Sequence, residues 1–159
     1  MAIVDESWQT LQSSIKERVM FLLNKEILSD VKFVVPLSIG ESESKKGISA
    51  HKFVLTISSP VFYAMFYGEM AETTDSIELP DCDYESLLEL FRCMYTDEVN
   101  LSGNNVIQVA YLAKKYMVPA LVEKCAAYLR DRLDASKLFC VLADAQKFQD
   151  EDMEDVCWG

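Results

Sequence analysis

The chain has 159 residues, which is enough for one domain with a fragment of a second. Hydrophobic residues make up 50% of it, so a substantial core is possible, and the net charge at pH 7 is −11. This acidic balance argues against a nucleic-acid-binding face and against binding to acidic lipid surfaces. It favours either solubility or the steering of a partner that carries a basic face.

The five cysteines are widely spaced and form no C-x-x-C motif. This usage is typical of reduced, mostly buried thiols in an intracellular protein. The first six residues lack the basic and apolar regions of a signal peptide, and no apolar run approaches the roughly 20 residues that span a bilayer. We therefore expect a cytoplasmic protein, with the nucleus as an alternative compartment.

Residues 7–28 are predicted to form one amphipathic helix with Ser7 as its cap. Apolar side chains recur along it at steps of three and four residues and form a single stripe: Trp8, Leu11, Ile15, Val19 and Leu22. Because this stripe precedes every other element, it needs a surface elsewhere. The helix either folds back on its own domain or packs on a second copy of the chain.

A hairpin and a pair of helices are predicted next. The polar segment 38–47 separates two runs with strand character, and Pro60 suits the first turn of a helix. The predicted strands cover 31–35 and 48–50, and the predicted helices cover 52–57 and 60–66, the second ending near Gly68.

The rest of the chain is predicted to alternate two short strands with helices. The strands cover 76–79 and 98–101; one helix is capped by Asp81 or Asp83, one begins at Asn104 or Asn105 and runs to about Tyr116, and one covers 119–133. This order predicts an α/β fold dominated by helices, with a small sheet on one side.

The domain boundary is predicted near residue 133. Residues 7–133 contain the elements of one domain, whereas residues 134–159 read as the start of a second helical module. A chain that ends at Gly159 would leave Trp158 without a surface to pack on, so we expect this second module to be truncated.

The sequence offers little support for an enzyme. His51 is the single histidine, and no cysteine or histidine stands at a metal-ligand spacing from it. No glycine-rich phosphate loop is present, and the paired carboxylates read as helix caps or solvated faces. We therefore expect no catalytic site, cofactor or metal, and a structural His51 at a helix start that bonds to nearby backbone or to an acid.

The run from Ser58 to Glu72 is the strongest candidate for a binding site. Phe66, Tyr67 and Met70 can fill or cover a pocket, while Glu72 supplies charge and direction. The alternative is that Phe66 belongs to the core and Glu72 is simply solvated, and spacing alone leaves both open.

Several separate motifs, in this order, resemble the BTB (POZ) family over roughly residues 10–133. They are Ser29-Asp30-Val31, Ala50-His51-Lys52-Phe53-Val54-Leu55, Ser58-Ser59-Pro60-Val61-Phe62, Met94-Tyr95-Thr96-Asp97 and Ala113-Lys114-Lys115-Tyr116 followed by Pro119-Ala120-Leu121. Three stretches look most like those of the BTB-BACK-PHR adaptors: Val61-Phe62-Tyr63-Ala64-Met65-Phe66-Tyr67-Gly68, Tyr116-Met117-Val118-Pro119-Ala120-Leu121 and the terminal Cys157-Trp158. Residues 134–159 are therefore interpreted as the start of a BACK module.

The resemblance implies a small sheet flanked by helical hairpins, with the N-terminal helix packed across the two-fold axis of a homodimer. The implied dimer interface contains the helix stripe and one residue of a charged pocket: Trp8, Leu11, Ile15, Val19, Leu22 and Asp30. The charged pocket would contain Asp30 and Lys52, and a local structural salt bridge between them is the alternative.

Many members of the family recruit cullin-3 to form a ubiquitin ligase and hold the substrate on a separate domain. The hydrophobic-x-Glu motif that contacts the cullin corresponds to Met70-Ala71-Glu72, bordered by Phe66, Tyr67 and Asn105. The alternatives are a homodimerisation scaffold without a ligase role and a transcriptional dimer that recruits corepressor peptides. The second would need zinc fingers, whose cysteine and histidine spacing this chain lacks.

Overall fold

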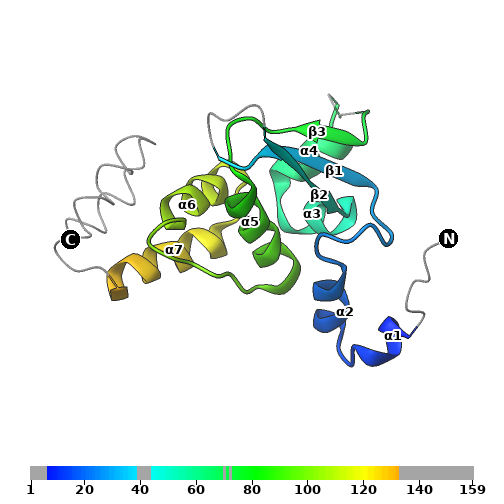
Figure 1. The fold of residues 1–159 in the computed structure, drawn as a ribbon, viewed down its shortest axis with the longest axis horizontal. Coiled ribbons are helices and arrows are strands. Elements are labelled where there is room, and N and C mark those ends of the chain that lie inside the picture. The colour runs from blue at the N-terminus through cyan, green and yellow to red at the C-terminus, as the bar shows by residue number, and fades with distance from the viewer. Residues whose placement is uncertain (1–6, 39–43, 70, 72, 133–159) are drawn as a thin grey trace.

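The computed structural model describes residues 7–38, 44–69, 71 and 73–132. Within them are seven helices and a three-stranded sheet that lies at one side of the molecule, with α5 between the sheet and the pair α6 and α7 (Figure 1). In chain order the elements are α1 (Trp8–Leu11), α2 (Ile15–Leu22), β1 (Val31–Pro36), β2 (Lys45–Ala50), α3 (Lys52–Ser58), α4 (Pro60–Tyr67), β3 (Ser76–Glu78), α5 (Tyr84–Thr96), α6 (Val106–Lys115) and α7 (Pro119–Arg132).

The sheet has the order β2-β1-β3, with β1 antiparallel to β2 and parallel to β3. Phe33 of β1 lies opposite Ile48 in one ladder and Ile77 in the other, and all three side chains are buried. The predicted hairpin is confirmed, but β2 begins at Lys45, inside the segment expected to be a polar connection. The residues 39–43 of that connection lie outside the description.

An aromatic cluster joins the sheet to three helices. Phe62 of α4 stacks on Tyr116 with ring centroids 4.5 Å apart and an interplanar angle of 4°. Phe33 meets the edge of Phe91 of α5 at 5.2 Å, and Phe62 meets Phe33 at 5.8 Å. Offset stacks and edge-to-face pairs are the favoured aromatic geometries, so this cluster fixes how α4, α5 and the end of α6 pack on β1.

The predicted single helix over 7–28 is wrong, because the chain breaks between α1 and α2. Ser14 accepts a hydrogen bond from the backbone N–H of Glu17 at 3.1 Å and so begins a new helix. The Glu17 carboxylate in turn accepts from both the backbone and the hydroxyl of Ser13, which lowers the pKa of Glu17. Side-chain capping therefore stabilises a turn where the apolar periodicity predicts a continuous helix.

The predicted strand over 98–101 is also wrong, since these residues form no regular element in the described structure. The backbone N–H of Glu98 donates to the Thr96 hydroxyl at 3.0 Å, and that of Asn100 donates to the Glu89 carboxylate at 2.8 Å. Side chains of α5 thus accept hydrogen bonds from backbone N–H groups that a β-strand would donate to a neighbouring strand. The half-buried side chain of Val99 packs on the core.

Local sequence signals correctly predicted the start of α5 and the end of α4. Asp83 caps α5 by accepting from the backbone N–H of Ser86 at 3.1 Å. Gly68 ends α4 as expected, and a Cβ at this position would lie 2.5 Å from the Ala64 carbonyl oxygen, so only glycine fits. The second helical module predicted over 134–159 lies outside the described residues.

We expect Phe62→Ala to lower the free energy of unfolding by about 3–5 kcal/mol, because it empties the centre of the aromatic cluster. The measurement is urea denaturation followed by tryptophan fluorescence. Tyr63→Ala is the matched control, since this neighbouring ring is exposed and its loss should cost under about 1 kcal/mol. Equal losses in the two variants would contradict this description of the core.

Candidate partner-binding site

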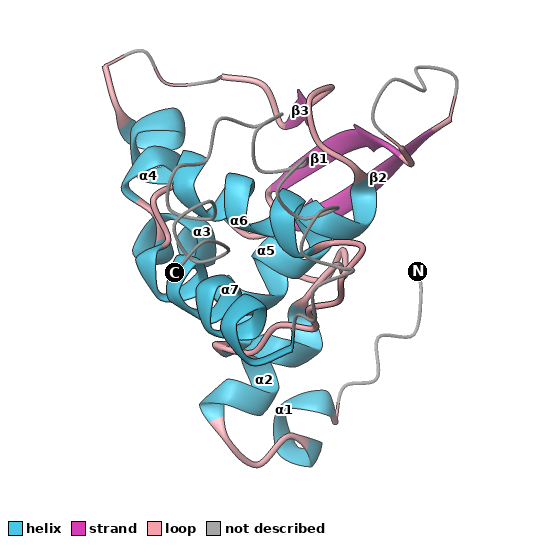
Figure 2. Ribbon diagram, turned by 90° about the vertical axis from the view of Figure 1, so that its left-hand side faces the viewer, coloured by secondary structure: helices cyan, strands magenta, loops and turns pink. Residues whose placement is uncertain are grey.

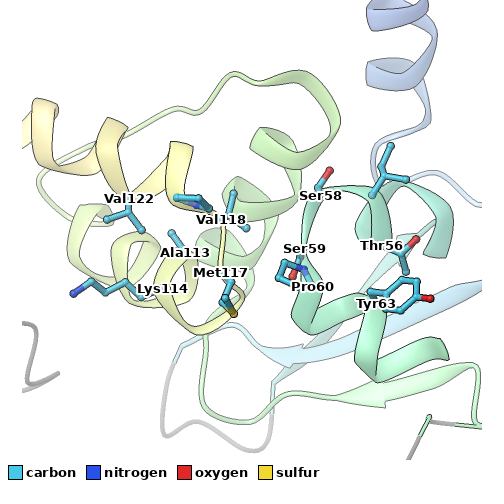
Figure 3. Close-up of a pocket in the computed structure, with 12 residues that line it drawn as sticks. Thr56, Ser58, Ser59, Pro60, Tyr63, Ala113, Lys114, Met117, Val118 and Val122 are labelled. Atoms are coloured by element: carbon cyan, nitrogen blue, oxygen red, sulfur yellow. The ribbon is translucent and has the colours of Figure 1, made fainter. Parts of the chain in front are cut away.

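An apolar groove of about 690 Å³ opens between the α3–α4 junction and the turn that joins α6 to α7 (Figure 3). Its first wall carries Pro60 and the exposed ring of Tyr63, and its second wall carries Ala113, Met117 and Val122. We call this feature the apolar groove. Exposed apolar surface in a concave site is typical of a binding site for a protein or a ligand.

The Ser59 hydroxyl holds the two walls of the apolar groove together. It accepts from the backbone N–H of Phe62 at 3.2 Å, which caps α4, and it donates to the carbonyl oxygen of Tyr116 at 2.5 Å. Tyr116 is the C-cap residue that directly follows α6, at a helix end where carbonyl groups lack helical partners. The beginning of one helix is therefore bonded to the end of another.

Met117 forms the turn of the second wall in a left-handed conformation, with φ 55°. Its N–H donates to the Lys114 carbonyl, and the N–H of Val118 donates to the Ala113 carbonyl at 2.8 Å. This pair of bonds defines a Schellman motif, whose left-handed residue is most often glycine. A methionine side chain is thus presented at the groove by a backbone position that disfavours side chains.

The predicted binding segment continues from this groove along α4. Tyr67 is exposed and contacts Tyr63, one turn earlier, with ring centroids 5.9 Å apart. Gly68 then ends the helix, and the Ala71 N–H donates to the Gly68 carbonyl at 3.2 Å. Met70 and Glu72, the predicted cullin contacts, lie outside the described residues.

Two other residues predicted for the cullin site, Phe66 and Asn105, do not line the apolar groove. Phe66 is buried in the core, where its ring stacks on Phe62 at 6.1 Å, which corresponds to the alternative that the sequence left open. Asn105 lies at the opposite end of α6 from Ala113, about 12 Å along the helix. Its amide donates to the Asn100 carbonyl and its oxygen accepts from the Ser102 N–H, so this side chain organises a loop.

The N-terminal arm, α1 and α2, projects from the rest of the described structure (Figure 2). Trp8 is buried because it stacks on Phe21 at 5.2 Å, so α1 folds onto α2 within one chain. Leu11 and Ile15 remain 65% and 69% exposed. The other two residues of the predicted stripe, Val19 and Leu22, are half-buried against the core.

Asp30 and Lys52 are adjacent, but not as an ion pair. The Asp30 carboxylate accepts from the backbone N–H of Lys52 at 2.8 Å and so binds the first residue of α3. The Lys52 ammonium lies 5.4 Å from the centre of the Phe66 ring. The local salt bridge that the sequence left as an alternative is therefore not formed between these two residues, which instead make a helix-terminal hydrogen bond and a cation–π contact.

His51 is buried and structural, as predicted. Its Nε2 lies 2.7 Å from the Ile27 carbonyl oxygen and must donate to it, which leaves Nδ1 to accept from the Tyr95 hydroxyl at 2.7 Å. The same hydroxyl accepts from the His51 backbone N–H at 2.9 Å. His51 thus links Ile27, in the segment between α2 and β1, to Tyr95 of α5.

Two features of the described residues bear on metal and thiol chemistry. None of their His, Cys, Asp and Glu side chains form a group of three or more that could hold a metal ion. Burial raises the pKa of the Cys82 thiol to about 12, so this group is protonated at neutral pH. No helix in the described part of the chain is long and apolar enough to cross a membrane.

Known proteins identify the family. A BTB/POZ domain model matches residues 20–133. The chain is 36% identical over 156 residues to BTB/POZ domain-containing protein 6 of Xenopus laevis, covering 98% of this chain and 29% of that protein. It is also 37% identical over 152 residues to BTB/POZ domain-containing protein 6-B of Danio rerio (96% and 31% covered) and 36% identical over 152 residues to BTB/POZ domain-containing protein 3 of Homo sapiens (96% and 28% covered).

The chain therefore belongs to the BTB/POZ domain family, whose domains are protein-interaction modules. This confirms the family and the fold that the sequence motifs predicted. The chain spans less than a third of the length of the curated relatives it matches.

Sequence reasoning missed three residues of the apolar groove, Pro60, Tyr63 and Met117, although all three stand inside motifs that it singled out. For Tyr63 a signal was available, because it precedes Tyr67 by one helical turn and shares its face. For Met117 no local signal existed, since its exposure depends on a turn that packs against α4.

We expect Met117→Gly to leave the free energy of unfolding unchanged or to raise it by up to about 1 kcal/mol, because glycine relieves the left-handed backbone. Thermal and urea denaturation measure this change. Val118→Gly, in the next residue, is the control and should destabilise, since Val118 is buried. A loss above about 1 kcal/mol in Met117→Gly would show that the side chain serves the fold rather than the surface.

Proposed function

We propose that this chain is the docking module of a dimeric adaptor that recruits cullin-3 to a ubiquitin ligase, with the substrate held by a domain outside this chain. The observation that carries the proposal is that the apolar groove lies along α4, the helix that directly precedes the Met70-Ala71-Glu72 motif in the sequence. Tyr63 lines the groove, Tyr67 contacts Tyr63, and α4 ends at Gly68, just before the motif. The proposed compartment is the cytoplasm.

The chemistry of this surface supports a protein partner with apolar anchors. Two exposed tyrosines and Met117 offer aromatic and thioether contacts, which are common at protein interfaces. Glu72 would add a charge at the rim that sets the orientation of the partner. The apolar side chains would supply most of the affinity.

The exposed part of the N-terminal arm supports a homodimer. Leu11 and Ile15 flank the break between α1 and α2, where a monomer leaves them in water. Phe53 of α3 is also largely exposed. A second copy of the chain would cover such residues in a self-complementary interface. Residues 134–159 would continue into a BACK module.

Replacing Leu11 and Ile15 together by glutamate should convert the dimer to a monomer, because two charges would enter an apolar interface. Sedimentation velocity measures the assembly state. Gln9→Glu with Gln12→Glu adds the same charge to the same arm and should leave the dimer intact. A wild-type chain that sediments as a monomer would refute the dimer.

Glu72→Lys should weaken binding to the N-terminal region of cullin-3 by at least about tenfold, because it reverses the charge at the rim of the site. Calorimetric titration measures the affinity. Glu69→Lys makes the same charge change three residues earlier and should alter the affinity by less than about threefold.

The titration also separates this function from its alternatives. A folded wild-type dimer that fails to bind cullin-3 would favour the scaffold without a ligase role. Equal losses in Glu72→Lys and Glu69→Lys would show that long-range charge, rather than the motif, governs the interaction.

A further inference from the structure

Met117 combines two properties that are unusual in one residue. Its backbone adopts φ 55°, a left-handed conformation that glycine adopts without the steric cost that a side chain adds. Its side chain is nevertheless 57% exposed and lines the apolar groove. A residue that is locally unfavourable and also does not fill the core points to a role at the surface.

Met117 is also the most exposed residue among the methionines that the structure describes. Met20 is 38% exposed and Met94 is 8% exposed, whereas Met65 is half-buried. Oxidation of a methionine follows its exposure to the oxidant. Figure 3 shows Met117 on the α6–α7 turn, across the groove from Pro60 and Tyr63.

We propose that Met117 is an oxidative modification site that controls occupancy of the apolar groove. A peroxide transfers one oxygen atom to the sulfur: the sulfur lone pair attacks the peroxide, the O–O bond breaks, an S–O bond forms, and water leaves. The thioether loses two electrons and the peroxide gains them. Methionine sulfoxide reductase restores the thioether, so the modification is reversible.

The chemistry of the groove explains why one oxygen atom matters. The sulfoxide is a strong hydrogen-bond acceptor, whereas Pro60, Ala113 and Val122 present carbon surfaces. A partner that buries Met117 would have to strip water from the sulfoxide without replacing its hydrogen bonds. This consequence rests on the proposed recruitment of cullin-3, whereas the modification itself does not.

The first part of the test needs no partner. The full chain is treated with dilute hydrogen peroxide, and peptide mapping by mass spectrometry follows oxygen uptake at each methionine. Met117, which is 57% exposed, should react faster than both Met20, which is 38% exposed, and Met94, which is 8% exposed. A rate at Met117 equal to or below that at Met20 would overturn the proposal.

The second part compares affinity for the N-terminal region of cullin-3 before and after treatment. Oxidation should weaken wild-type binding about tenfold, and methionine sulfoxide reductase should restore it. In Met117→Leu the ratio of treated to untreated affinity should approach one, whatever the starting affinity, whereas in Met20→Leu it should match the wild type. An equal loss in Met117→Leu would overturn the proposal and point to Met70.

The two parts keep this inference separate from the proposed function. An untreated dimer that does not bind cullin-3 would refute the proposed function, while the order of oxidation would still decide whether Met117 is the modified residue.

Discussion

The Ser59 hydroxyl is the contact on which the candidate site depends. It accepts from the first turn of α4 and donates to the terminal carbonyl of α6, so one buried atom satisfies two helix ends. A helix cap alone is worth about 1 kcal/mol, and a buried carbonyl left without a donor would add to the loss. Because both walls of the apolar groove meet at this hydroxyl, the groove has a fixed width before any partner arrives, which lowers the entropy cost of binding.

Helix α4 has one face that packs in the core and another face that is exposed for binding. Phe62 and Phe66 face inward and join the aromatic cluster, whereas Tyr63 and Tyr67 face outward as a pair. The buried rings hold α4 in place, and this placement presents the two tyrosines at the surface. Gly68 completes the arrangement, because only a residue without a Cβ lets the chain leave α4 toward the Met70-Ala71-Glu72 motif at this point.

Local chemistry made much of the fold predictable, and contacts between distant residues account for what was missed. The strand of β1, the Asp83 cap and the end of α4 follow from nearby residues. The break near Ser14 was missed because side-chain capping competes with apolar periodicity. No strand forms near Asn100 because its backbone N–H donates to the carboxylate of Glu89 in α5, a contact that the local sequence does not reveal. The Met70-Ala71-Glu72 motif could be recognised from the sequence. The apolar groove could not, because it is lined by Tyr63 and Met117, which lie far apart in the sequence.

The most direct test of this account is methyl NMR on a chain whose methionines carry carbon-13 methyl groups, titrated with the N-terminal region of cullin-3. If the partner docks in the apolar groove, the Met117 signal should shift or broaden with saturation, while the buried Met94 signal stays in place. Binding that leaves the Met117 signal unchanged would contradict the account, because the partner would then occupy another face of the domain.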